Sequence, residues 1–372
     1  MTLESRQLPT KPNLRHLKDQ AKDLHKSGDA ESLSDAQFQI AKAYGFASWT
    51  RLKRQVEIYT VIDSGHLKGA ADMILETHKD NRSSVGLNDA PADLTPMQIA
   101  AFWEPAAVPA MQAAGAELDL HSACAIGDTA TIRSLAIDSA MTQQAEHMTP
   151  MGYAVRCGQP DAVRALLEAG DDPNRPLARI GFYVWEMHAH RGGIAKWVPL
   201  HGACAHGYWP TAPDTIRFLL NGGADTTITS CLGEAPIHYA ACHGWVASLD
   251  ALHQQGVDLD MRTSPPHPAV AEMANPEGNE SGDALTPLMI AVREGLTDAV
   301  AYLVQHVDLA AVDTKGLTAL HVAAKPWWRE NIDVVKLLLA AGADPGSIDS
   351  EGRRPLDLAN KAGYANTAKL LA

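Results

Sequence analysis

An internal repeat constrains this chain more than any other feature of its sequence. Residues 317–324 (Leu-Thr-Ala-Leu-His-Val-Ala-Ala) have the pattern of a short helix, and a second apolar stretch, 333–339, precedes the triplet Gly-Ala-Asp at 342–344. The same order of segments occurs at 198–225. Self-similarity over a few tens of residues is typical of a solenoid, in which each unit buries its apolar face only against its neighbours. The sequence therefore predicts an all-α array of helix-turn-helix units.

Each unit begins with a variant of the tetrapeptide Thr-Pro-Leu-His. A threonine there can cap the first helix, and proline suits its first turn, where no backbone donor is needed. The proline position of this motif falls at Pro96, Asp119, Pro150, Pro199, Pro236, Pro287, Ala319 and Pro355. The motif and the period of about 33 residues resemble the ankyrin repeat. The resemblance implies an array of about eight units over residues 60–372, in which the histidine braces the turn by bonding to adjacent backbone. We assign this role to His121, His201, His238 and His321.

Two spacings between units, 49 residues from Pro150 to Pro199 and 51 from Pro236 to Pro287, exceed the ankyrin period by roughly half a repeat, which predicts insertions at 175–197 and 262–283. The first is rich in aromatic residues and histidine: Trp185, His188, His190 and Trp197. It is an extended hairpin, a lid folded onto the groove of the array, or a local satellite core. The second is rich in proline, glycine and acidic residues and reads as a surface loop.

A helical segment, residues 1–59, precedes the array. Apolar residues recur at helical spacing in two stretches, 13–27 and 33–44, and a third helix follows Trp49. These helices can form a small bundle or cover the open end of the array. Residues 14–22 and 44–49 resemble the helical segment that precedes ankyrin repeats in some bacterial proteins, and the resemblance implies a bacterial source.

Composition narrows the function classes. Residues 1–60 hold 10 basic and 7 acidic side chains, which leaves 21 basic and 37 acidic residues for the remainder. An acidic array disfavours nucleic-acid binding. There is no apolar run of about 18 residues and no apolar signal region at the N-terminus, so neither a membrane span nor secretion is expected. Five scattered cysteines without a Cys-x-x-Cys pair fit the reducing cytoplasm.

The resemblance to ankyrin repeats also implies candidate binding residues, because two positions near the end of each first helix face the concave groove in that fold. Two histidines, His206 and His243, occupy equivalent slots in adjacent repeats. The predicted pocket has a floor and a roof. The floor consists of Arg156, His206, Cys242, His243, Arg293 and Glu294. The roof consists of Trp185, His188, His190 and Trp197. Histidines that titrate near neutral pH could bind an anion or carry out acid–base chemistry.

Two functions from different classes follow. The first is a non-enzymatic interaction module that binds a protein partner through its groove and loops. The second is a small-molecule-binding protein or cofactor-independent enzyme, in which the insertion 175–197 covers a His/Arg pocket and holds a small anionic ligand. No nucleophile motif, P-loop, dinucleotide fingerprint or HExxH is present. We therefore favour the first function and expect no cofactor and no metal, although His188, His190, His206 and His243 could form a metal site if they converge.

Overall fold

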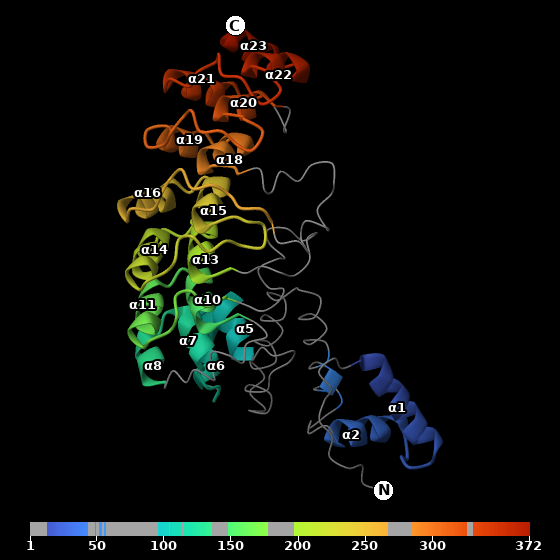
Figure 1. Ribbon diagram of the computed structural model, residues 1–372. Helices are drawn as coiled ribbons and strands as arrows, with labels where there is room; N and C mark the ends of the chain where they lie inside the picture. Colours follow the sequence, from blue (N-terminus) through green and yellow to red (C-terminus); the bar gives the residue numbers. More distant parts are fainter. Residues whose placement is uncertain are drawn as a thin grey trace. The chain divides into compact units, whose positions relative to one another are not determined.

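A computed structural model describes most of the chain, and its regular elements are helices (Figure 1). The described residues are 13–43, 49, 52–53, 56, 96–103, 105–113, 115–135, 148–177, 197–266, 284–325 and 330–372. They divide into two compact units, Met1–Ile126 and Gly127–Ala372. The expected boundary at residues 59/60 lies outside the described residues and stays a prediction. No helix among the described residues is long and apolar enough to cross a membrane.

The first unit contains the N-terminal helices α1 (Leu14–Lys26) and α2 (Leu33–Ala43). Asn13 caps α1, because its side-chain oxygen accepts from the backbone N–H groups of Arg15 and His16. The two helices share one apolar core, whose buried residues are Leu17, Ala21, Ala30, Ala36, Ile40, Ala41, Leu52 and Val56. The apolar periodicity of residues 13–27 and 33–44 therefore predicted both helices and their buried faces correctly.

The remaining described helices of this unit are α5 (Pro96–Trp103), the 3-10 helix η1 (Pro105–Ala107), α6 (Val108–Ala113) and α7 (Leu120–Ile126). Helix α5 packs against α7. The carboxylate of Asp119 accepts from the backbone N–H of Ser122 at 2.7 Å, so Asp119 is the capping residue of α7. It therefore fills the threonine position of the motif. The assignment of Asp119 to the proline position, and of His121 to the histidine position, is wrong by one residue.

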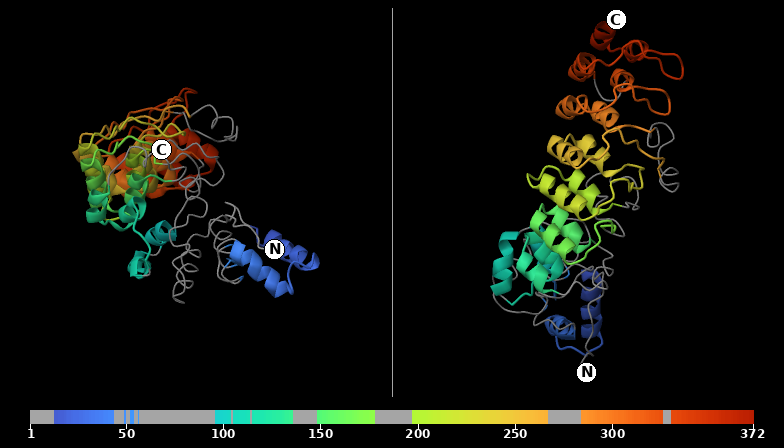
Figure 2. Two further views of the ribbon diagram at one scale, coloured as in Figure 1. Left: turned by 90° about the horizontal axis from the view of Figure 1, so that it is seen from below. Right: turned by 60° about the vertical axis from the view of Figure 1, so that its left-hand side comes forward.

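The second unit is a stack of helix pairs in two rows (Figures 1 and 2). The first helices of successive pairs lie side by side in one row, and the second helices form the other. The first row comprises α10 (Pro150–Arg156), α13 (Pro199–Ala205), α15 (Pro236–His243), α18 (Pro287–Glu294), α20 (Ala319–Ala324) and α22 (Pro355–Ala362). The second comprises α8 (Thr129–Ser134), α11 (Pro160–Glu168), α14 (Ala212–Asn221), α16 (Val246–Gln254), α19 (Thr297–Leu303), α21 (Ile332–Ala340) and α23 (Ala365–Leu371). This arrangement confirms the predicted all-α solenoid.

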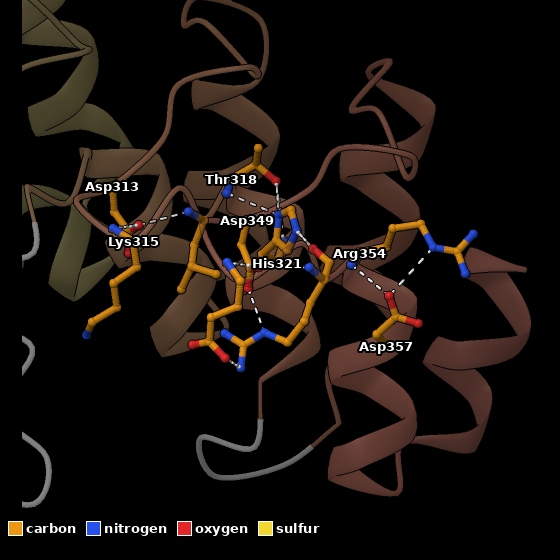
Figure 3. A network of polar contacts seen from close by, with 10 residues as sticks. Asp313, Lys315, Thr318, His321, Asp349, Arg354 and Asp357 are labelled. Atoms are coloured by element: carbon orange, nitrogen blue, oxygen red, sulfur yellow. Dashed lines mark hydrogen bonds and ion pairs between the residues drawn. The ribbon is translucent and has the colours of Figure 1, made fainter.

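A buried histidine fastens the start of a first helix to the next repeat. Nδ1 of His321 accepts from the backbone N–H of Thr318 at 3.2 Å (Figure 3). Its proton is therefore on Nε2, which lies 3.0 Å from the carbonyl of Arg353 and donates to it. His201 and His238 make the same pair of bonds, and all three histidines are at most 1% exposed. The structural role expected for these three histidines is confirmed.

The loops between repeats share one backbone hydrogen bond across a tight turn. The N–H of Ser230 donates to the carbonyl of Glu234, and equivalent bonds join Asp313 to Leu317 and Asp349 to Arg353. At the two long loops the same bond joins residues much farther apart in sequence, namely Leu177 to Trp197 and Thr263 to Leu285. Both insertions are thus expansions of one turn, closed at the base. Most of each insertion lies outside the described residues.

Candidate functional site

The predicted site residues that the structure describes lie at the ends of consecutive first helices. Arg156 is the last residue of α10 and His206 follows the last residue of α13. His243 and Glu294 are the last residues of α15 and α18. Because these helices are neighbours in one row, the stacking brings the four side chains to one edge of the second unit, with His206, His243 and Glu294 at equivalent positions.

Three aromatic side chains near this edge form a cluster that we call the aromatic patch: Tyr208, Trp209 and Trp245. The ring centroid of Tyr208 lies 5.3 Å from that of Trp209 and 6.2 Å from that of Trp245. Separations in this range and tilted or edge-on geometries are favourable for aromatic pairs. Tyr208 is 46% exposed and Trp209 is 36% exposed. The patch therefore offers a large apolar surface to solvent.

Two indole hydrogen bonds fix the patch to the preceding repeats. Nε1 of Trp209 donates to the carbonyl of Arg156 at 3.0 Å, and Nε1 of Trp245 donates to the carbonyl of Ala205 at 3.1 Å. Arg156 and Ala205 are the last residues of α10 and α13, so the bond repeats in register from one unit to the next. The indoles are thus held rigidly, with part of each surface left exposed.

Charged groups border the patch on both sides. The guanidinium of Arg156 donates a hydrogen bond to the hydroxyl of Tyr208. Three repeats after Arg156, Nε of Arg293 lies 3.0 Å from a carboxylate oxygen of Glu294. The Arg293–Glu294 pair largely neutralises its own charge. Arg156 places a guanidinium group directly beside Tyr208.

The two histidines of the predicted pocket differ from the acid–base pair that we expected. His206 is 5% exposed, and burial, with the positive charge of Arg156 and the proximity of His243, lowers its pKa to about 3. Burial also lowers the pKa of His243, although Glu294 opposes the shift. A histidine with a pKa of about 3 is neutral at pH 7. The expectation that His206 titrates near neutrality is wrong, because stacking removes its ring from water.

The cysteine thiols near this edge are protonated at neutral pH. Burial raises the pKa of Cys242 to about 12, and burial raises the pKa of Cys157 to about 12 despite the charge of Arg156. Since the thiolate is the reactive form, neither side chain has the character of a nucleophile. Cys242 is thus a packing residue at the end of α15.

Trp197 does not join the other candidates. Its indole is 6% exposed, and Nε1 donates to the hydroxyl of Tyr239 at 3.2 Å. The ring also packs 4.8 Å from Tyr239 and 6.3 Å from His201, centroid to centroid. Tyr239 and His201 lie in the first halves of α15 and α13, whereas His206 and His243 lie at the other ends of these helices. The remaining roof residues, Trp185, His188 and His190, lie outside the described residues.

The sequence contained a signal for the aromatic patch that our candidate set did not use. Both histidines are followed by glycine and then by aromatic residues, in His206-Gly207-Tyr208-Trp209 and in His243-Gly244-Trp245. Gly207 allows the indole of Trp245, from the next repeat, to approach the backbone closely, whereas an added Cβ at Gly244 would meet the side chain of Leu296. A glycine followed by an aromatic residue after α13 and after α15 is the pattern that marks this surface.

Comparison with known proteins identifies the repeats. Residues 146–175 match a family described as ankyrin repeat, and residues 266–349 and 288–372 match a family described as ankyrin repeats in three copies. The chain therefore contains ankyrin repeats, as its motif predicted. Among solved structures, it is similar to the ankyrin repeat domain of human ASB11, with 21% identity, a TM-score of 0.48 and coverage of 68% of this chain and 96% of that one. It is also similar to the ankyrin repeat domain of Bcl-3, with 22% identity, a TM-score of 0.49 and coverage of 68% of this chain and 98% of that one.

The matches to two curated relatives cover only part of each of those proteins. Ankyrin repeat and SOCS box protein 16 of Mus musculus is 28% identical over 237 residues, which covers 62% of this chain and 44% of the relative. Zinc finger CCCH domain-containing protein 50 of Oryza sativa subsp. japonica is 42% identical over 97 residues, or 24% and 15% of the two chains. This chain thus spans less than half of either relative. Both are eukaryotic proteins and lend no support to the bacterial source expected from residues 14–49.

Proposed function

We propose that this chain is a non-enzymatic scaffold that binds a protein partner, and that the aromatic patch with Arg156 is its main contact surface. The observation that carries the proposal is the exposure of Tyr208, 46%, at a position where three other rings and Arg156 already restrain it. Tyrosine, tryptophan and arginine are the residues in which interface binding energy is concentrated. A side chain that is already ordered loses little entropy on binding.

The chemistry of the patch favours one kind of partner segment. The faces of Tyr208 and Trp209 suit an apolar side chain, and the guanidinium of Arg156 suits a carboxylate. We therefore infer a partner that presents an apolar residue next to an acidic one. In ankyrin repeats the ends of the first helices border the concave side, which places this surface where a bound segment can also contact the loops. Five free thiols support action in a reducing compartment such as the cytoplasm.

The rival function, a His/Arg pocket for a small anion or for catalysis, has no supporting observation of its own. It needs a histidine that exchanges protons near pH 7, and His206 has a pKa of about 3. It also needs a roof from Trp197, whose ring is packed between His201 and Tyr239. The binding scaffold accounts for the exposed aromatic patch, which the rival function leaves unexplained.

A selection from a phage-displayed random peptide library tests the proposed function. The wild-type chain is the bait, and we expect enriched peptides that combine an apolar with an acidic residue. Tyr208→Ala should weaken the binding of a selected peptide at least tenfold, and Arg156→Glu should remove the preference for acidic residues. The matched control is Ile348→Ala, since Ile348 is 64% exposed in a loop far along the array. Enrichment of peptides whose affinity is the same for Tyr208→Ala and wild type would refute the proposed surface.

A further inference from the structure

A second group of polar side chains lies on the row of second helices, away from the aromatic patch. His253 is on α16, and Tyr302 and His306 are on and just after α19, which packs against α16. Nδ1 of His253 lies 3.1 Å from the hydroxyl of Tyr302. That hydroxyl donates in turn to a carboxylate oxygen of Asp250 at 3.1 Å. The carboxylate of Asp250, the phenol of Tyr302 and the imidazole of His253 thus form a continuous series of hydrogen bonds, which we call the relay.

The relay determines which nitrogen of His253 carries a proton. A phenol has one proton, and Tyr302 gives it to Asp250, so the phenol oxygen can only accept from His253. Nδ1 of His253 is therefore the protonated nitrogen, and Nε2 holds a lone pair in the neutral ring.

The arrangement at His253 has the form of a metal ligand with its supporting shell. Metal-binding histidines donate one ring N–H to a carboxylate, carbonyl or similar acceptor, which orients the ring and leaves the other nitrogen for the ion. Nε2 of His253 has no hydrogen-bond partner among the described residues. A second imidazole is adjacent, because the ring centroid of His306 lies 4.4 Å from that of His253, at an interplanar angle of 60°.

We propose that His253 and His306 form a two-histidine binding site for a divalent transition-metal ion such as Zn²⁺. Imidazole nitrogen is a preferred ligand of this ion, at about 2.0–2.1 Å. One ion at that distance from a nitrogen of each ring is compatible with ring centroids 4.4 Å apart. His306 is exposed, so the ion reaches the site from solvent and keeps water as its remaining ligands.

The surroundings of the two imidazoles also suit a cation. Asp250 supplies a carboxylate two hydrogen bonds away, and its second oxygen accepts from Gln254 at 2.6 Å. The residues after position 60 carry 37 acidic against 21 basic side chains, which favours cation binding over anion binding. No group of three or more His, Cys, Asp or Glu side chains within the described ranges is arranged to hold a metal. The site therefore rests on two protein ligands and on the relay that orients one of them.

Isothermal titration of the purified, untagged chain with zinc chloride tests the proposal. We expect one saturable site per chain, weakened at least tenfold in His253→Ala and in His306→Ala. Tyr302→Phe keeps both imidazoles but removes the hydroxyl that accepts from Nδ1–H of His253. The loss of a group that orients a metal-binding histidine costs about 10-fold in metal affinity. A loss of affinity in this variant, which keeps both imidazoles, distinguishes the relay from a simple pair of surface histidines.

Two controls are needed because the chain contains 16 histidines. His16→Ala removes another exposed histidine, and Tyr364→Phe removes a phenol hydroxyl elsewhere in the second unit; both should bind Zn²⁺ as the wild type does. Helical circular dichroism verifies that each variant is folded. The proposal is overturned if wild type has no saturable site, or if His253→Ala and His306→Ala bind as tightly as wild type. Equal affinity of Tyr302→Phe and wild type would overturn the role of the relay.

Discussion

The indole of Trp245 lies directly against the backbone of Gly207, in the space where a larger residue would have its Cβ. An added Cβ at Gly207 would be 2.4 Å from Cγ of the indole and 2.7 Å from Oγ of Ser248. Gly207 is not among the glycines with positive φ, so this close approach, and not backbone conformation, requires glycine. Trp209 approaches Gly158 in the same way, one repeat earlier. Stacking of indole on glycine therefore joins these repeats and positions the aromatic patch.

Gly207→Ala tests this contact. The added methyl group has to displace a packed indole, so we expect a loss of about 1–3 kcal/mol in the free energy of unfolding, measured by urea denaturation. Gly346→Ala is the matched control, because Gly346 lacks a positive φ and its added Cβ would meet only the flexible carboxylate of Asp344 at 3.2 Å. That variant should stay within about 0.5 kcal/mol of wild type. Equal losses in the two variants would show that the indole contact contributes nothing.

The two indole hydrogen bonds make a second prediction. Trp209→Phe and Trp245→Phe keep an aromatic ring and remove the N–H donors to the carbonyls of Arg156 and Ala205. Each variant should be less stable by about 1 kcal/mol. The bond of Trp245 is partly buried and that of Trp209 is exposed, so Trp245→Phe should cost more in urea denaturation. The reverse order would contradict the assigned environments.

Buried histidines predict a pH dependence of stability. Burial lowers the pKa of His201 to about 4 and that of His238 to about 4, against about 6.5 in the unfolded chain. Because the folded-state pKa is the lower one, the stabilisation is complete above pH 6.5 and is lost as pH falls towards 4. For each of these histidines, the free energy of unfolding should fall by about 2 kcal/mol from pH 7 to pH 5, because the unfolded chain binds a proton there that the folded chain does not.

Replacing one of these histidines separates its contribution from that of the carboxyl groups. His201→Asn should destabilise the chain at pH 7, since it removes the bonds to Val198 and to the carbonyl of Glu234. The difference from wild type should shrink by about 2 kcal/mol at pH 5, where wild type has lost the contribution of His201. A difference that stays constant between the two pH values would show that His201 does not titrate on unfolding.

Thiol reactivity provides a fourth prediction. With pKa values of about 12, Cys157 and Cys242 should react slowly with an alkylating reagent at pH 8 in the native chain and rapidly in urea. Peptide mapping by mass spectrometry resolves the individual sites. Rapid native modification of Cys242 would mean that its thiol is a reactive group, and would reopen the catalytic alternative.

The elements of the fold were predictable because their signals are local. The proline of the motif marks the first residue of α10, α13, α15 and α18, and the buried histidines bond within their own turn. The error at His121 arose because α7 begins with a different capping residue, Asp119, which shifts the motif by one position. The bounds of the insertions depended on the backbone bonds at Leu177–Trp197 and Thr263–Leu285, which sequence does not display.

The candidate site was less predictable because it depends on stacking between repeats. The sequence placed His206 and His243 in equivalent slots, with Arg156 one repeat earlier, and the structure brings the three residues to one edge. It did not reveal that stacking buries His206, and therefore lowers its pKa, while Tyr208 stays exposed. The sequence did not indicate that His253 and His306 are adjacent either. The two residues lie on and just after second helices of different repeats, so stacking between the repeats brings them together.

Hydrogen–deuterium exchange of the chain, alone and saturated with a peptide selected against it, tests the proposed binding surface most directly. We expect the peptide to slow exchange at 205–209 and 243–245, the backbone that carries Tyr208, Trp209 and Trp245, and we expect Tyr208→Ala to abolish this protection. Protection confined to the second helices α11, α14 and α16, with none at 205–209, would contradict it.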